Sequence, residues 1–406
     1  MGALGPMDPD GSGAGRGVLL LPPDHTRGHS FGGLICAMIY GRLRGEGRRV
    51  HVMPALGTHE AMTEADCESF FGGAVPYADV IAHDWREGVV RLGEVPASLV
   101  AELSGGRMDS PIPVEVNGRI VGGDYGLIVS IGQVVPHEVA GMANHSKNVF
   151  VGCGGSGMIN ATHMLGAAIG LEGIVGLADN PVRRVLDYAA EGFLGGVPLR
   201  YVHTVVSSRG GPPSLRGVYC GDRRDVFERA AELSSRVNVF KVADPPMAFS
   251  AYLDPGEFKS MWLGNKAIYR ARKAIPDGGV LYVLAGGVRR FGEDPVIDGL
   301  IRKYGYAGRD AVLSLCKAER DLGENLSAAA HLIHGSTDGR FSVVYCTRHL
   351  TKGEVEGVGY GHMDYGEACG LLGLEGLSEG LNTAPGMPGG LLYHIANPAL
   401  GLWERG

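Results

Sequence analysis

The feature that most constrains the fold is an apolar run, Leu127–Val135, which ends in Pro136-His137. The run has strand length and no charged residue, which is typical of a strand buried on both faces of a parallel sheet. A polar and glycine-rich loop follows, and a helical pattern begins near Met158. Ligands of open α/β sheets bind just past the carboxyl ends of such strands. We therefore expect functional side chains in the loop that follows this run.

Two earlier strands show the same arrangement. Gly17–Leu21 is a predicted strand that runs into Pro23-Asp24-His25-Thr26-Arg27, and Arg49–Leu56 is a second strand that runs into Gly57-Thr58-His59. Thr63–Asp66 can cap the start of a following helix. Polar residues thus follow successive strands, which predicts a doubly wound sheet with its chemistry at one edge.

The remaining patterns along the chain alternate between helix and strand. Helices are expected over 30–43, 158–168, 180–188, 224–235, 255–275, 295–303 and 310–334. Strands are expected over 78–83, 89–92, 116–121, 199–206, 237–242, 279–284 and 341–347. This alternation predicts an α/β fold.

The length of the chain predicts its domains. A chain of 406 residues exceeds what one core usually fills, so two domains are expected. We place the boundary at Asp244-Pro245-Pro246, which punctuates the chain. The prediction is two Rossmann-like α/β domains, 17–245 and 246–384, with the active site in the cleft between them. Residues 1–16 are expected to be a disordered extension, and 385–406 is a candidate to return to the first domain.

Composition indicates which classes of partner and which cellular compartment to expect. The formal net charge is −7 and no basic tract is present, which argues against nucleic acid or an anionic membrane as a partner. Seven scattered cysteines without a C-x-x-C pair fit reduced thiols in a cytoplasmic protein. No signal peptide and no apolar run of membrane-spanning length is visible in the sequence. We therefore expect a cytoplasmic protein, and leave open whether it forms a homo-oligomer.

Several side chains at the strand ends could carry chemistry. His59 and His137 come from different strand ends, and two imidazoles on opposite faces of a substrate can act as an acid/base pair that inverts a stereocentre. Arg27 offers a planar clamp for a carboxylate, with Asp24 to orient Arg27 or His59. Lys147 could form a covalent link to a carbonyl-type group. Hydrogen-bonded loop histidines, a local ion pair and a solvated lysine are the alternatives without function.

His137, Lys147 and His163 together resemble the core motif of the lactate racemase family that depends on a nickel-pincer nucleotide. Two upstream pieces, 23–27 and 55–64, agree with that family in the same order. The resemblance implies that Lys147 carries a pyridinium-3-thioamide-5-thiocarboxylate mononucleotide and that His163 completes the nickel coordination. An imidazole beside soft sulfur donors suits nickel(II) in a planar arrangement.

The resemblance also implies substrate and cofactor contacts. Lys266 aligns with a family lysine near the substrate, beside Arg27 and Asp24. The glycine cluster 152–157 precedes a helix, so we expect Gly154, Gly155 and Ser156 to hold the cofactor phosphate through free amides.

The implied activity is racemisation or epimerisation of a 2-hydroxy acid, in which the cofactor accepts a hydride while a histidine takes the hydroxyl proton. Cofactor maturation enzymes would be partners. The sequence departs from the family pattern around the pocket, at Gly28, Glu60, Leu263 and 143–146, so we expect a 2-hydroxy acid other than lactate. Two alternatives remain open: a divalent-metal hydrolase or lyase that uses the same His/Asp cluster, and a non-catalytic cofactor-binding homologue.

Overall fold

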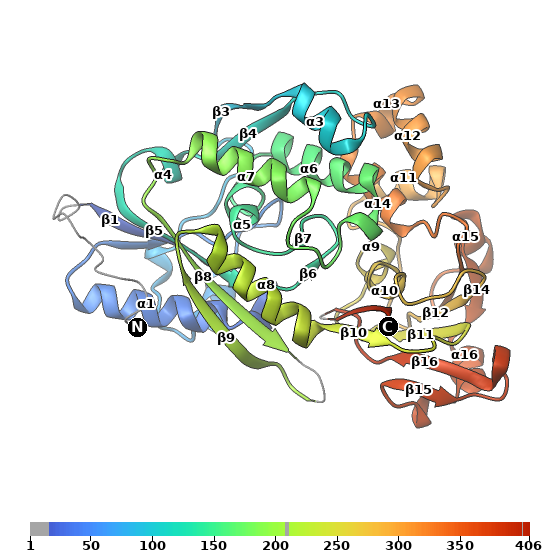
Figure 1. Cartoon of the computed structure of the whole chain (residues 1–406). Helices are drawn as coiled ribbons and strands as arrows, with labels where there is room; N and C mark the ends of the chain where they lie inside the picture. Colours follow the sequence, from blue (N-terminus) through green and yellow to red (C-terminus); the bar gives the residue numbers. More distant parts are fainter. Residues whose placement is uncertain (1–15, 208–210, 400) are drawn as a thin grey trace. The chain divides into compact units, whose positions relative to one another are not determined.

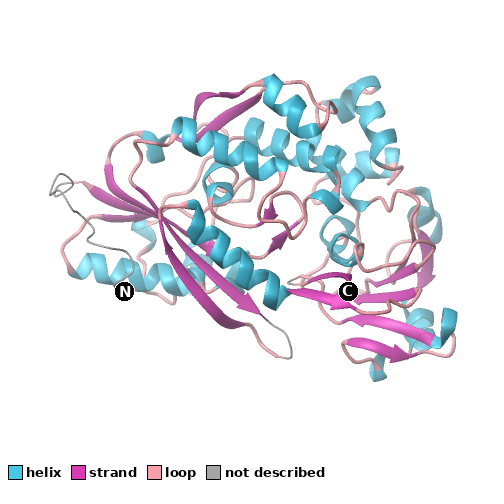
Figure 2. Ribbon diagram, viewed as in Figure 1, coloured by secondary structure: helices cyan, strands magenta, loops and turns pink. Residues whose placement is uncertain are grey.

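The computed structural model describes residues 16–207, 211–399 and 401–406 (Figure 1). The expected N-terminal extension lies outside these residues except for Arg16. The chain divides into two compact units, one of residues 1–165 with 174–238 and the other of 166–173 with 239–406. Strands and helices are mixed in both, which confirms the α/β class (Figure 2). The active site predicted for the cleft between the domains stays a prediction.

The first unit is built on a five-stranded sheet with the order β2-β1-β5-β8-β9. Its strands are β2 (Val50–Val52), β1 (Gly17–Leu21), β5 (Tyr125–Gln133), β8 (Leu199–Ser207) and β9 (Ser214–Gly221). The first four are parallel, and β9 is an antiparallel edge strand. Every residue of β1 is buried, because helices cover both faces of a sheet of this type.

Helices α1 (Gly32–Gly45) and α8 (Arg224–Asn238) cover opposite faces of that sheet. Val202 and Val205 of β8 show this, since an odd separation places them on opposite faces of a strand. Val202 belongs to the core cluster of α1, and Val205 to the cluster that α8 builds around Phe227.

The first unit has further elements outside the five-stranded sheet. Two small antiparallel sheets pair β3 (Val89–Val95) with β4 (Ile112–Asn117) and β6 (Pro136–His137) with β7 (Gly141–Met142). The remaining helices are α2 (Glu64–Phe71), α3 (Ala97–Ser104), α4 (Gly118–Val121), α5 (Ser146–Phe150), α6 (Ser156–Ile169) and α7 (Pro181–Phe193). Thr63 and Asp66 form a reciprocal capping box at the start of α2, as predicted.

The predicted strand 78–83 does not form. Only Val80 makes a bridge, to Val52, and Tyr77–Asp79 is a 3-10 turn. The amides of Asp79 and Val80 donate back to the carbonyls of Pro76 and Tyr77, so they are not available for a strand ladder.

The second unit has a six-stranded sheet with the order β14-β13-β12-β11-β16-β15. Its strands are β11 (Ala248–Tyr252), β12 (Val280–Leu284), β13 (Ser342–Thr347), β14 (Gly361–Asp364), β15 (Gly380–Thr383) and β16 (Leu391–Ile395), and a separate pair joins β10 (Val239–Val242) to β17 (Leu402–Arg405). The return of 385–406 to the first domain is therefore corrected. β16 is hydrogen-bonded to β11 and β17 to β10, both within the second unit.

The long helix predicted over 310–334 is divided into three. The helices of this unit are α9 (Met261–Gly264), α10 (Lys266–Ala271), α11 (Pro295–Tyr304), α12 (Arg309–Ala318), α13 (Arg320–Gly323), α14 (Leu326–Gly335), α15 (Lys352–Gly357) and α16 (Tyr365–Leu372). Glu319 has extended dihedral angles and ends α12, and Asn325 caps α14 through a bond from the amide of Ala328. These two residues account for the breaks.

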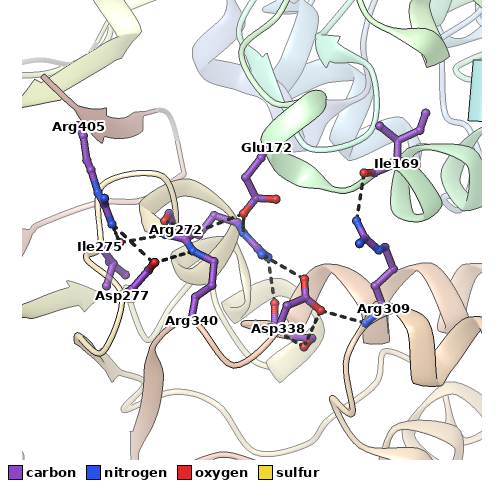
Figure 3. Close-up of polar contacts among 10 residues, drawn as sticks. Ile169, Glu172, Arg272, Ile275, Asp277, Arg309, Asp338, Arg340 and Arg405 are labelled. Atoms are coloured by element: carbon purple, nitrogen blue, oxygen red, sulfur yellow. Dashed lines mark hydrogen bonds and ion pairs between the residues drawn. The ribbon is translucent and has the colours of Figure 1, made fainter. Parts of the chain in front are cut away.

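Residues 166–173 belong to the second unit although the chain then returns to the first. Figure 3 shows how Glu172 of this segment faces Arg272. The Arg272 side chain is only 2% exposed, and it donates to Glu172 Oε1 at 2.7 Å and to the carbonyl of Ser336 at 2.9 Å. Burial alone would raise the pKa of Glu172, but the charges of Arg272 and Arg340 outweigh burial and lower it. The segment is thus held by a buried charge with matched partners.

No helix in the described part of the chain is long and apolar enough to cross a membrane.

Candidate active site

The sheet order explains why the loops that carry several of the predicted residues lie at one edge of the sheet. β1 lies between β2 and β5, and all three are parallel, so their carboxyl ends share one edge of the sheet. Beyond the strands, a bridge joins Pro23 to Ala55, and the amide of Gly57 donates to the carbonyl of Gly152 at 2.8 Å. The loops after the three strands are therefore hydrogen-bonded to one another.

Asp24 is the buried centre of this edge, with 2% exposure. Its carboxylate accepts from His59 Nδ1 at 2.7 Å, from the amide of Thr26 at 3.1 Å and from Arg27 Nη1 at 3.4 Å. Burial alone would raise the pKa of Asp24. The hydrogen bonds from His59 and Thr26 and the charge of Arg27 outweigh burial and hold that pKa well below its usual range. Asp24 is thus ionised at neutral pH.

An ionised carboxylate can only accept, so the hydrogen-bonded Nδ1 of His59 must carry a proton. In the neutral imidazole, Nε2 of His59 then has the lone pair. The side chain is half in solvent, with 53% exposure, whereas its partner Asp24 is buried. Nε2 of His59 can therefore take a proton from a ligand, and Asp24 stabilises the cation that results.

His137 has the opposite arrangement. It lies on β6, where its Nδ1 accepts from the backbone amides of Val139 at 3.1 Å and Ala140 at 3.4 Å. A nitrogen that accepts from an amide carries no proton, so the proton of a neutral His137 lies on Nε2.

His163 is half-buried in the middle of α6. Its Nδ1 lies 2.6 Å from the carbonyl oxygen of Ile159, one helical turn earlier, and must donate to it. This bond leaves Nε2 with the lone pair, the state that a metal-ligating histidine has when a carbonyl holds its other nitrogen. Burial lowers the pKa of His163, and the charge of Lys147 lowers it further, which favours the neutral imidazole that a metal needs.

Lys147 is half-buried on the short helix α5. Burial, followed by the charge of Arg27, lowers the pKa of its amine to about 8, although Glu138 and Asp24 act in the opposite direction. The charges of Asp24 and Arg27 thus act on Lys147, and that of Lys147 acts on His163. An appreciable neutral fraction at physiological pH is what a lysine needs to act as a nucleophile.

The two residues that precede Ser146 have strained backbones. Asn144 and His145 have φ angles of 71° and 59°, which residues other than glycine rarely adopt. Asn144 Nδ2 donates to the carbonyl of Gly132 at 2.6 Å, and the His145 ring stacks on Tyr201 with centroids 4.2 Å apart. These buried contacts hold the strained turn that presents Lys147.

Arg183 of α7 is a residue that sequence reasoning missed. It is completely buried, and its guanidinium donates to the carbonyl of Asn144 and to Ser146 Oγ, each at 3.1 Å, and to the carbonyl of Met142. These partners surround the strained turn, so Arg183 holds the residues that lead into α5 in place. No local motif marks this role, because the contacts depend on how α7 packs.

The backbone beside the predicted phosphate contacts is engaged by Glu115. Glu115 Oε2 accepts from the amides of Gly157 at 3.0 Å and Met158 at 3.3 Å, so a carboxylate already occupies these first-turn amides of α6. A Cβ on Gly154 would lie 1.8 Å from the carbonyl oxygen of Phe150, and a Cβ on Gly155 2.3 Å from Glu115 Oε2. Close packing thus requires these glycines, and cofactor contacts at Gly154, Gly155 and Ser156 stay a prediction.

Lys266 begins α10 of the second unit, where its ammonium lies 5.9 Å from the centre of the Phe258 ring, and its contact with substrate stays a prediction. Among the described residues, no group of three or more His, Cys, Asp or Glu is arranged to hold a metal ion.

A pocket of about 290 Å³ opens beside the 3-10 turn that carries Arg27. Its lining comprises His25, Gly28, Phe31, Gly33, Leu34, Asp66, Ser69 and Phe70. None of the predicted catalytic or cofactor residues is part of that lining.

Comparison with known proteins shows which domain and which solved structures the chain is similar to. Residues 11–170 match the lactate racemase N-terminal domain. A search of curated proteins gave no match. A crystal structure of a protein from Thermotoga maritima superposes with a TM-score of 0.79 at 23% identity, over 96% of this chain and 94% of that chain. The lactate racemase apoprotein from Thermoanaerobacterium thermosaccharolyticum superposes with a TM-score of 0.72 at 18% identity, over 96% of this chain and 86% of that one.

The structural likeness extends the shared fold over nearly the whole chain, beyond the part that the family match covers. Residues 11–170 are therefore similar to the lactate racemase N-terminal domain, and nearly the whole chain shares the fold of the two solved structures.

Proposed function

We propose that the protein is a racemase or epimerase of a 2-hydroxy acid and works with a nickel-pincer nucleotide attached to Lys147. The observation that carries the proposal is that burial, together with the charge of the nearby Lys147, lowers the pKa of the His163 imidazole. Lys147 has an amine with a pKa lowered to about 8, and the hydrogen bond from Nδ1 to Ile159 leaves Nε2 of His163 with a lone pair. A covalent tether and one imidazole ligand are what such a cofactor requires of a protein.

The remaining residues would handle the substrate. Arg27 is 45% exposed and lies beside the buried Asp24, so its guanidinium can bind the carboxylate of a 2-hydroxy acid from solvent. His59, with its Nε2 lone pair, can accept the hydroxyl proton. When bound, the cofactor supplies an acceptor for the hydride that leaves the alpha carbon. We place Lys266 at the substrate as well, and Gly154, Gly155 and Ser156 at the cofactor.

The substrate is proposed to be a 2-hydroxy acid other than lactate. The turn before Lys147 is built from Asn144 and His145, which are locked by Gly132 and Tyr201, and Gly28 lines the neighbouring pocket. These residues differ from the family pattern, so the surroundings of the cofactor residues are changed. The enzymes that mature the cofactor are proposed partners, the cytoplasm is the proposed location, and homo-oligomerisation is open.

Expression with cofactor-maturation enzymes and nickel tests the proposal. The peptide that contains Lys147 should gain the mass of the cofactor, and the protein should invert 2-hydroxy acids in a chiral chromatography assay. Lys147→Met should abolish the mass gain, whereas His163→Ala should keep the tether and lose nickel. An unmodified Lys147 in nickel-replete, fully matured protein would contradict the proposal.

The same preparation separates the two alternatives. A hydrolase or lyase would contain zinc or manganese without a mass gain on Lys147. A non-catalytic homologue would carry the cofactor and catalyse no exchange of the alpha hydrogen of any 2-hydroxy acid.

A further inference from the structure

The three histidines of the candidate site do not have the same protonation pattern. The Nδ1 atoms of His59 and His163 face acceptors, the Asp24 carboxylate and the Ile159 carbonyl. Nδ1 of His137 faces donors, the amides of Val139 and Ala140. Because these partners cannot exchange donor and acceptor roles, they fix the tautomer of each ring.

The difference decides which ring can carry a proton. Protonation of His59 at Nε2 keeps the bond from Nδ1 to Asp24 and adds the attraction of a buried carboxylate. Protonation of His137 would place a second N–H on Nδ1, directed at the amide of Val139. The hydrogen bond would be replaced by a repulsion between two donors, which opposes protonation of His137 at Nδ1.

We infer that His59 carries the proton in this site, whereas His137 acts as a neutral hydrogen-bond donor through its Nε2–H. This inference rests on the proposed function and departs from the symmetrical acid/base pair expected from the sequence. Nε2 of His59 would take the hydroxyl proton of the substrate, and a bound cofactor would supply the acceptor for the alpha hydrogen and its electron pair, which leaves a 2-keto acid. Return of the hydride to the opposite face of the keto acid, together with the proton from His59, would give the inverted hydroxy acid.

In this scheme His137 orients the substrate and polarises its oxygen. A neutral imidazole that donates through Nε2 can stabilise the oxygen of the substrate without changing its own protonation state. The backbone of the β6–β7 hairpin, through Val139, keeps the ring in that state. A glutamine side chain can replace such a donor, but it cannot replace a proton carrier.

The tautomers can be measured on the protein without cofactor. Two-bond ¹H–¹⁵N correlation spectra of histidine-labelled protein at pH 7.5, assigned with His59→Gln and His137→Gln, should show the proton on Nδ1 of His59 and on Nε2 of His137. A proton on Nδ1 of His137 would overturn the inference. The result does not depend on cofactor or activity, so it is separate from a failure of the proposed function.

Activity of the matured protein tests the roles. His137→Gln should reduce kcat by about tenfold or less, whereas His59→Gln should reduce it by about 10²–10⁴-fold, the usual contribution of a general base. His137→Phe, which removes the donor, should be slower than His137→Gln. Equal losses in the two glutamine variants, with unchanged thermal unfolding, would show that both rings transfer protons and would overturn the inference.

Discussion

His59 Nδ1 and Asp24 Oδ2 lie 2.7 Å apart, and the carboxylate is buried while the imidazole reaches solvent. This pair fixes both the tautomer and the orientation of the ring in the absence of ligand. It also joins the ends of two strands, because Asp24 follows β1 and His59 follows β2. The pair is therefore the most directly testable part of the candidate site.

Asp24→Asn should remove the preference for a proton on Nδ1 of His59. In a Ser-His-Asp triad the same exchange lowers kcat by about 10⁴-fold, and we expect a loss of at least about a hundredfold in the matured protein. Thr26→Val is the control, because it removes a different donor to Asp24 and leaves the His59 contact in place. A near-normal kcat for Asp24→Asn would contradict a role for this pair in proton transfer.

Asp24 should also affect acid stability. Its pKa in the folded protein lies below the ordinary value, about 3.9 in unfolded chains, so it stabilises the fold above that pH. This stabilisation is lost as the pH falls through the folded pKa. The urea midpoint of the wild type should therefore fall more steeply below pH 4 than that of Asp24→Asn. Parallel curves from pH 6 to pH 3 would contradict the lowered pKa.

Lys147 should react with acylating reagents at unusually low pH. With a pKa of about 8, it should reach half of its maximal labelling rate near pH 8, whereas an unperturbed lysine does so near 10.4. Peptide mass spectrometry gives both rates from one sample, with the exposed Lys352 as reference. Arg183→Met removes a positive charge that lowers the pKa of Lys147, so it should shift the midpoint upward. Identical profiles for the two lysines would count against an activated amine.

Position 145 should favour glycine over alanine. Both His145→Gly and His145→Ala lose the stacking on Tyr201, but only glycine adopts a φ of 59° without strain. His145→Gly should therefore be more stable than His145→Ala by about 1 kcal/mol or more, from the cost of a strained backbone. Urea unfolding of the unloaded protein measures the difference, and equal stabilities would show that the turn has relaxed.

Gly155→Ala should be destabilising through Glu115. The new Cβ would lie 2.3 Å from Glu115 Oε2, so Glu115→Ala should reduce the cost of the substitution in the double variant. Gly154→Ala is the matched control, because its Cβ meets the backbone oxygen of Phe150, which Glu115→Ala cannot move. Melting temperatures of the wild type, the two single variants at 155 and 115, their double variant and the Gly154→Ala control measure these effects. If Gly155→Ala left stability unchanged, the packing explanation for this glycine would fail.

The strand-end placement of Asp24, His59 and His137 could be predicted from the sequence, because apolar runs mark buried parallel strands and their carboxyl ends share an edge. The sequence also predicted that β1, β2 and β5 belong together, since each run is short, apolar and followed by polar residues. The family resemblance then supplied the expected roles of Lys147 and His163.

Other parts of the site depend on packing that no local pattern records. Arg183 is one of two adjacent arginines in a predicted helix, and only the position of α7 decides that it is the buried one. Glu115 occupies the start of α6 because β4 passes beside it. The positive φ angle of His145 opposes the preference of its residue type, so tertiary contacts impose it. The tautomer of His137 likewise follows from a hairpin that the sequence did not predict.

The segment 166–173 has a consequence for dissecting the chain. Helix α6 begins in the first unit and ends in the second, where Arg272 neutralises Glu172. A truncation after residue 238 would retain every strand of the first sheet but leave Glu172 and its neighbours without their partners. No single cut therefore yields two intact halves, and during translation the end of α6 gains its ion-pair partner only after Arg272 has been synthesised.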